Sequence, residues 1–192
     1  MAEGVQELVA RAAADDEQAF AELVQPDWPR LYRLCLRFVQ DPGRAEDLAQ
    51  EALARAWLRL PQLRDGVAFT PWLLQTAANL AKNELRRRRE DPVPDEVFER
   101  AAGDGDVASG LLRGEQRRRI ELALAGLPPM QRVAVELVLR DEISYREAAG
   151  ILGVPLGTLK TLVHRGRARL RAELSEEPAQ TRGGTAHVKA DY

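Results

Sequence analysis

The stretch ILGVPLGTLKTLVHRGRARLR, residues 151–171, combines a turn signal with a run of positive charge. Beyond Gly153 its ionisable residues are Lys, Arg and one His, with no acid, although the whole chain carries a formal net charge of -2. Gly153 suits the left-handed end of one helix, and Pro155 suits the first turn of the next. Upstream, Ser144 and Glu147 have the spacing of a capping box, which starts a helix. The pattern predicts a short helix, a tight turn and a cationic helix, which together form a helix-turn-helix.

A helix-turn-helix of this kind indicates DNA binding. Its second helix lies in the major groove, where hydroxyl, ammonium and guanidinium groups reach bases and phosphates. The side chains expected to face outward are Thr158, Lys160, Thr161, His164 and Arg165, and those expected to face inward are Leu156, Leu159, Leu162 or Val163, and Leu170. The charge of this helix alone has two alternative causes. Arginine is abundant throughout the chain, and a basic helix can also bind an acidic protein or a membrane surface.

Two more helices are expected just before this motif. In LLRGEQRRRIELALAGL the predicted inward residues are Ile120, Leu122, Ala123 and Leu127, with Arg117, Arg118 and Arg119 largely outside. In MQRVAVELVLRDE they are Val133, Ala134, Leu137 and Val138. With the helix-turn-helix, these segments predict a small helical domain.

A separate helical block precedes it. Asp41 and Pro42 suit the cap and first turn of a helix over residues 44–60. Its apolar residues recur at the 3, 4 spacing of one helical face: Ala45, Leu48, Ala49, Ala52, Leu53, Ala56, Trp57 and Leu60. The opposite side carries Glu46, Asp47, Gln50, Glu51 and Arg55. From periodicity alone, this strip is an ordinary solvated face or a binding surface.

The next helix ends in a cluster of bases. We expect it to start at Thr70 with Pro71 in its first turn, and to bury Leu74, Ala77, Ala78, Ala81 and Leu85. Away from that stripe lie Asn79, Lys82, Asn83 and Arg86, and the helix ends in four consecutive arginines, residues 86–89. Arginines complement a helix C-terminus, but four exceed what capping needs. Cations beside amides suit a nucleic-acid strand, while Trp72 reads as core.

Composition favours an all-α protein, because only 5% of residues are aromatic and Ala and Leu dominate the apolar ones. The single cysteine, Cys35, excludes a disulfide framework and a structural zinc site. No signal sequence or membrane-length apolar run stands out, so we expect a cytoplasmic protein. The only histidines are His164 and His187, and no metal-ligand or paired-carboxylate spacing appears. We therefore expect no catalytic residues, no metal and no cofactor.

An acidic stretch separates the two helical blocks. Between Glu90 and Asp106 there are seven acids and one base, with two prolines and two glycines among them. We interpret residues 91–110 as a flexible linker between two domains. A surface loop within one domain is the alternative, although about 20 residues without regular structure inside a compact domain are uncommon.

These segments, in this order, resemble the extracytoplasmic-function (ECF) sigma factors of the sigma-70 family. AEDLAQEALARAW resembles the region 2 helix, and FTPWLLQTAANLAKNELRRR the promoter-melting segment that follows it. LPPMQRVAVELV and ISYREAAGILGVPLGTLKTLVHRGRARL resemble region 4. The resemblance implies an all-α chain of two small helical domains: region 2 over residues 14–90 and region 4 over 114–174. A linker over 91–113 joins them. The tail over 175–192 is polar and matches no motif, so we expect it to be disordered.

The resemblance also implies a role for each surface. Asp47, Gln50 and Glu51 would bind the clamp coiled coil of core RNA polymerase. The loop over residues 63–69 and Asn79 would hold an unstacked base of the -10 element, with Lys82, Arg86 and Arg87 along the strand. The implied -10 contacts are Leu63, Asp65, Asn79, Lys82, Arg86 and Arg87, and the implied -35 contacts are Pro155, Gly157, Thr158, Lys160, Thr161, His164, Arg165 and Arg167.

The implied partners are core polymerase, promoter DNA and an anti-sigma protein, with no small-molecule substrate. The acidic linker would run toward the RNA exit channel of the polymerase. Two residues depart from the family pattern: Leu162 stands where an Arg is usual, and Gly166 replaces a common Ala, which would loosen the helix by about 0.5–1 kcal/mol. A stand-alone helix-turn-helix regulator, whose first block binds another protein or dimerises, is the alternative function.

Overall fold

The computed structural model of the 192-residue chain describes residues 2–63, 68–90 and 111–175. In those ranges every regular element is a helix, as composition predicted. The linker residues 91–110, the tail beyond residue 175 and Asp65 of the implied -10 site lie outside the described residues. None of the described helices has the length and apolarity needed to cross a membrane.

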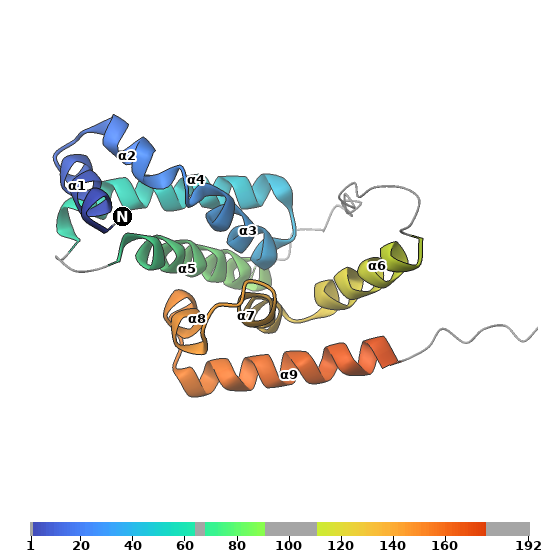
Figure 1. The fold of residues 1–192 in the computed structure, drawn as a ribbon. Helices are drawn as coiled ribbons and strands as arrows, with labels where there is room; N and C mark the ends of the chain where they lie inside the picture. The colour runs from blue at the N-terminus through green and yellow to red at the C-terminus, as the bar shows by residue number, and fades with distance from the viewer. Residues whose placement is uncertain (1, 64–67, 91–110, 176–192) are drawn as a thin grey trace, which may run out of the picture.

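The first unit contains α1 (Ala2–Ala13), α2 (Glu17–Val24), α3 (Trp28–Val39), α4 (Pro42–Arg59), the short 3-10 helix η1 (Leu60–Gln62) and α5 (Phe69–Glu90). Helices α3, α4 and α5 pack against one another, and α1 and α2 cover one end (Figure 1). The buried residues of α4 are Ala45, Leu48, Ala49, Ala52 and Ala56, which lie on the predicted face. Because most are alanines, neighbouring helices approach α4 closely.

Side-chain caps fix the starts of two helices in this unit. Asp41 Oδ1 accepts a hydrogen bond from the Arg44 amide at 2.8 Å, which confirms the predicted cap of α4. Asp16 caps α2 in the same way, and each such cap stabilises its helix by about 1 kcal/mol. Thr70 does not begin α5, because the helix already starts at Phe69. Its hydroxyl instead donates to Asp27 Oδ2 at 2.6 Å and ties the start of α5 to that of α3.

The second unit contains α6 (Leu111–Gly126), α7 (Pro129–Leu139), α8 (Tyr145–Leu152) and α9 (Leu156–Ser175). Its first helix starts inside the segment expected to be linker, 91–113. Ser144 caps α8 through the Glu147 amide at 3.2 Å, and Gly153 ends it in the left-handed conformation with φ of 59°. The predicted helix-turn-helix is therefore α8, the turn at Gly153 and α9.

Two predictions about the core of this unit are wrong. In α6, Ile120 and Leu122 are 45% and 51% exposed, because this helix buries only Ala123 and Leu124, together with Leu127 just after its end. In α9, Leu156 is 39% exposed, and the buried positions are Leu159, Val163 and Gly166. The first turn of α9 projects beyond the core, so its apolar residue stays in solvent.

The middle of helix α7 is buried on all sides. Every residue from 132 to 137 is buried, including Arg132 and Glu136, because α3, α8 and α9 all pack on this helix. The sequence predicted one inward face with Val133, Ala134 and Leu137. The additional burial comes from the first unit, which covers the side of α7 that would otherwise face solvent.

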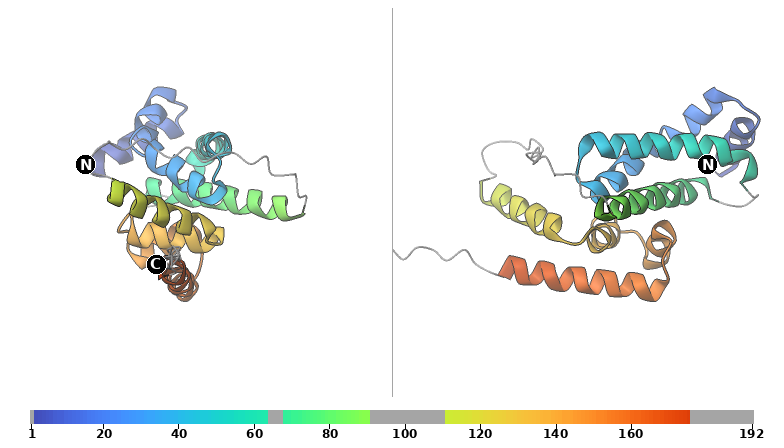
Figure 2. Two further views of the ribbon diagram at one scale, coloured as in Figure 1. Left: turned by 90° about the vertical axis from the view of Figure 1, so that its right-hand side faces the viewer. Right: turned by 180° about the vertical axis from the view of Figure 1, so that it is seen from behind.

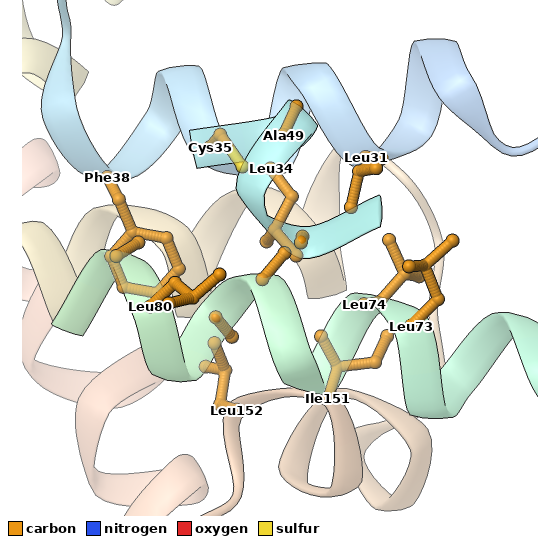
Figure 3. Packing of buried hydrophobic residues seen from close by; sticks show 14 of the residues in the cluster. Leu31, Leu34, Cys35, Phe38, Ala49, Leu73, Leu74, Leu80, Ile151 and Leu152 are labelled. Atoms are coloured by element: carbon orange, nitrogen blue, oxygen red, sulfur yellow. The ribbon is translucent and has the colours of Figure 1, made fainter. Parts of the chain in front are cut away.

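The two units pack against each other through α5 with α8 and α3 with α7. In the front and rear views, α8 lies between α5 and α9 (Figures 1 and 2). Figure 3 shows Ile151 and Leu152 of α8 directed toward α5. Helix α5 buries Leu73 and Leu80 in addition to its predicted stripe, of which Leu85 is only partly buried. One hydrophobic cluster runs through both units.

Candidate protein and nucleic-acid interfaces

The acidic strip of α4 comprises Glu46, Asp47, Gln50, Glu51 and Arg55, and all five side chains are exposed. Two contacts stay within the helix: Arg55 Nη2 donates to Glu51 Oε1 at 2.5 Å, and Gln50 Nε2 donates to Glu46 Oε1 at 3.4 Å. The acidic strip is held by a helix whose opposite face is almost entirely buried alanine. It therefore presents carboxylates and an amide on a rigid outer surface, a suitable arrangement for a basic partner.

The α5 face comprises Asn79, Lys82, Arg86 and Arg87. Asn79 and both arginines are exposed, and Arg87 Nη2 lies 3.3 Å from Glu84 Oε2. Lys82 was expected to lie away from the buried stripe. It is instead half-buried, and its ammonium donates a hydrogen bond to Leu152 O of α8 at 2.9 Å. Burial lowers the pKa of this lysine below its usual value. Leu63, at the end of η1, is half-buried.

The α9 face is the set of -35 residues expected from the sequence, and all of them are exposed: Pro155, Gly157, Thr158, Lys160, Thr161, His164, Arg165 and Arg167. Leu159 and Val163 anchor the opposite side of α9 in the core. The Thr161 hydroxyl donates to Gly157 O at 3.0 Å, which leaves its oxygen free to accept. The helix thus presents hydroxyls and cations together on one side.

A hollow of about 460 Å³ lies between the start of α8 and the middle of α9. Its polar lining brings Lys160, His164 and Arg167 together with Tyr145 and Arg171, two residues that sequence reasoning did not assign to the site. Arg171 follows Arg167 by one helical turn, and that spacing was a usable signal. Tyr145 had none, because only the fold places α8 beside this part of α9.

Sequence reasoning also missed a buried ionic cluster between the units. Arg37 of α3 donates two hydrogen bonds to Asp141, at 2.5 and 2.7 Å, and its Nε lies 3.3 Å from Glu136 Oε2. Burial raises the pKa of Asp141, but the hydrogen bond from Arg37 and the charges of the nearby arginines together outweigh burial, so this pKa is lowered. Burial raises the pKa of Glu136 despite the nearby arginines. The helical periodicity does not identify Arg37, Glu136 and Asp141 as buried, because charged residues in a sequence are expected at the surface.

Arg132 is the other buried cation of this interface. Its guanidinium donates to Arg37 O at 2.7 Å and Phe38 O at 3.2 Å, in the last turn of α3. It also donates to Ala125 O at 3.1 Å and Leu127 O at 3.3 Å, where α6 ends. A cation at two helix C-termini complements both dipoles and satisfies carbonyls that lack helical partners.

Gly166 permits the close approach of α9 to α7. A Cβ at this position would lie 2.5 Å from Val135 Cγ2 and 3.3 Å from Gln131 O. The sequence suggested that this glycine only loosens the helix. The structure corrects that view, since the missing side chain is what allows the two helices to pack.

The described residues contain no group of three His, Cys, Asp or Glu side chains that could hold a metal ion. The three surfaces hold carboxylates, amides, hydroxyls and permanent cations. Such groups bind proteins and nucleic acids by hydrogen bonds and charge.

Comparisons with known proteins match both units. The model of Sigma-70 region 2 matches residues 23–90, and that of Sigma-70, region 4 matches residues 117–170. The ECF RNA polymerase sigma factor SigW of Bacillus subtilis is 32% identical over 182 residues, covering 90% of this chain and 97% of that protein. The ECF RNA polymerase sigma-E factor of Escherichia coli K12 is 33% identical, covering 84% and 90%.

Solved structures agree. The sigma factor RpoE, in complex with the anti-sigma factor NepR from Bartonella quintana, is 29% identical with a TM-score of 0.63, covering 83% of this chain and 98% of that one. CnrH, in complex with the cytosolic domain of CnrY, is 25% identical with a TM-score of 0.64, covering 89% and 97%.

The two regions in one chain define a transcription initiation factor rather than a stand-alone DNA-binding regulator. The chain belongs to the sigma-70 family of RNA polymerase sigma factors, in its ECF group.

Proposed function

We propose that this sigma factor divides its work between the acidic strip of α4, the α5 face and the α9 face. Residues 14–90 act as region 2 and residues 114–174 as region 4. The linker, 91–113, connects them. The main support is the placement of carboxylates on one exposed helix face and of cations with hydroxyls on another.

The acidic strip binds core polymerase. Asp47, Gln50 and Glu51 project from one side of a rigid helix, and their charge selects a basic partner surface such as that of a coiled coil. No Lys or Arg outside the strip pairs with Asp47 among the described ion pairs.

The α9 face reads the -35 element as duplex. Lys160, Arg165 and Arg167 supply phosphate contacts, and Thr158 and Thr161 supply hydrogen bonds to base edges. Tyr145 and Arg171 extend the cationic hollow beside it. Leu162 is half-buried, so it packs inward rather than contacting DNA.

The α5 face, with Leu63 and Asp65, captures a flipped base of the -10 element. Asn79 offers an amide to the base, while Lys82, Arg86 and Arg87 follow the strand. Capture offsets an unstacking cost of a few kcal/mol, which couples recognition to melting. The factor carries no chemistry of its own and acts in the cytoplasm. An anti-sigma protein is a further partner, as for the similar RpoE from Bartonella quintana.

Binding to purified core polymerase tests this division. Asp47→Lys should weaken the complex at least about tenfold, because it places a like charge against the basic partner surface. Glu22→Lys is the matched control, since Glu22 is an exposed acid on α2 of the same unit. Equal binding by wild type and Asp47→Lys in a co-purification titration would exclude the acidic strip as the polymerase site.

A further inference from the structure

Thr161 lies on the side of α9 that turns away from the core. Leu159 and Val163 are almost fully buried on the opposite side. Thr161 shares its exposed side with Thr158, three residues before it, and Arg165, four residues after it. It belongs to the first half of the helix, and the N-terminal part of a recognition helix is the part that reaches base edges. Thr161 is therefore placed to contact a base.

The hydroxyl of Thr161 is a hydrogen-bond acceptor with a fixed position. Its Oγ1 donates to Gly157 O, one turn earlier in α9, at 3.0 Å. A hydroxyl has one hydrogen and two lone pairs, so while this bond is kept Thr161 can only accept from a partner. The β-branched side chain and the bond to Gly157 O together select one rotamer, which fixes the place of the acceptor oxygen.

The surface beside this oxygen is open. A Cβ built on Gly157 would have no atom within 4 Å, and the Thr161 side chain is itself exposed. Because Gly157 presents bare backbone one turn before Thr161, a base edge can approach the Thr161 oxygen without displacing another side chain.

The other polar groups of the α9 face are mostly donors. Its ammonium and guanidinium groups donate hydrogen bonds and cannot accept them. Residues 156–172 contain no Asp, Glu, Asn or Gln, so this part of α9 has no carboxylate or amide acceptor. The side-chain acceptors of the face are the hydroxyls of Thr158 and Thr161 and, in its neutral form, a ring nitrogen of His164. A base that offers a donor to this face must meet one of these three side chains.

Thr158 differs from Thr161 in its hydrogen bonding. Its hydroxyl has no intramolecular partner among the described residues, so it can donate to a base or accept from one. Thr161 has that choice only by giving up its bond to Gly157 O. The two threonines therefore read bases by different rules.

Bases differ in the group that they present at this level of the major groove. Adenine N6 and cytosine N4 are amino donors, whereas guanine O6 and thymine O4 are acceptors. An amino group gains a hydrogen bond to Thr161 Oγ1 without breaking another. A carbonyl oxygen gains one only when Thr161 releases Gly157 O, so one hydrogen bond replaces another and the net gain is small.

We infer that Thr161 selects an amino-bearing base, adenine or cytosine, at the position of the -35 element that it contacts, and discriminates there against guanine and thymine. This inference rests on the role proposed above for the α9 face and names the base chemistry that one of its residues reads. Thr158, whose hydroxyl is free, imposes no such choice.

Competition binding of -35 duplexes to the full-length chain, assembled with core RNA polymerase, tests the selection. Base pairs of the best-bound duplex are inverted one at a time, which exchanges the amino and carbonyl groups in the major groove. With wild type, inversion at the pair that Thr161 reads should weaken binding about fivefold, the effect of one net hydrogen bond. Thr161→Val keeps the shape but has no acceptor, so sensitivity to inversion should disappear at that one pair, and the base selected there should be adenine or cytosine.

Where the selected base is adenine, 2-aminopurine provides a second measurement. It also pairs with thymine, but its amino group lies in the minor groove, so only the major-groove donor is lost. The replacement should weaken wild-type binding as much as inversion does, and it should leave binding by Thr161→Val unchanged.

Two further variants separate the acceptor from other effects of the substitution. Thr161→Ser retains a hydroxyl that can make the same bond to Gly157 O, so the amino preference should persist. Thr76→Val is the matched control, because Thr76 Oγ1 of α5 donates to Trp72 O at 2.9 Å across the same spacing but lies outside the three proposed surfaces. Its inversion profile should equal that of wild type. Circular dichroism confirms that each variant keeps its helices.

A guanine or thymine at the pair where Thr161→Val removes sensitivity would overturn the inference, as would an inversion profile that Thr161→Val leaves unchanged. Both outcomes leave duplex binding by α9 intact. A wild-type chain that does not join core polymerase, or whose complex prefers no -35 sequence, would refute the proposed function instead.

Discussion

At Gly166, the absence of a side chain decides how closely α9 approaches α7. Helix propensity alone favours alanine there by about 1 kcal/mol. The position of Val135 Cγ2, 2.5 Å from where a Cβ would stand, reverses that preference. The backbone oxygen of Gln131, at 3.3 Å, leaves little room for the helix to move aside.

We predict that Gly166→Ala lowers the free energy of unfolding by about 1–2 kcal/mol, because overpacking outweighs the gain in propensity. Gly150→Ala is the matched control: this helical glycine has no atom within 4 Å of a built Cβ, so the change should stabilise by about 0.5–1 kcal/mol. Urea denaturation measures both. In the double variant Val135→Ala with Gly166→Ala, the loss of unfolding free energy should be smaller than the sum of the losses in the two single variants. Equal stabilisation by both alanines would contradict the close approach.

Individual polar residues show where sequence reasoning reaches its limit. The caps Asp41 and Ser144 were predictable, because a cap depends only on neighbours three residues away. Arg132 and Asp141 were not, because their partners lie in the other unit or, for Arg132, also at the end of α6. A buried arginine and a surface arginine look the same in one sequence.

At the level of the element, α9 is an amphipathic helix whose apolar side is anchored and whose polar side is free. Its exposed residues could be named from the sequence, since the helical period and the turn at Gly153 fix which side faces solvent. The first turn was the exception, because Leu156 projects past the core.

We predict that Lys160→Ala and Arg165→Ala each weaken binding to a promoter duplex while leaving affinity for core polymerase unchanged. Each variant loses a cationic contact. Where that contact is to a phosphate, the slope of log affinity against log salt concentration should become shallower by about one. Arg117→Ala, an exposed arginine on α6, is the control. Fluorescence anisotropy against salt concentration measures the slope, and an equal loss of polymerase binding would contradict the division between α4 and α9.

Helices α5 and α7 bury more residues than the one apolar face that the sequence pattern predicts for each. For α7 the extra burial comes from α3, α8 and α9, which all pack on it. In α5, Leu73, Ala77 and Leu80 follow a second helical spacing, so the extra face could have been found. In α7 it could not, because Arg132 and Glu136 are polar.

At the level of the whole molecule, the division into two helical units could be predicted, since proline, glycine and acids interrupt the helical pattern between them. Their mutual packing could not. It depends on tertiary contacts such as Lys82 with Leu152 O and Arg37 with Asp141, which carry no local signature. Function followed from the order of the motifs, while the buried interface became visible only in the structure.

The most direct test is run-off transcription with purified core RNA polymerase, the full-length chain and a library of promoter fragments. We predict that adding the chain produces discrete transcripts that core polymerase alone does not make. The selected fragments should share two elements about 25 base pairs apart, because two separate units read them. If the chain neither joins core polymerase nor directs initiation at any fragment, the division of work between α4, α5 and α9 is wrong.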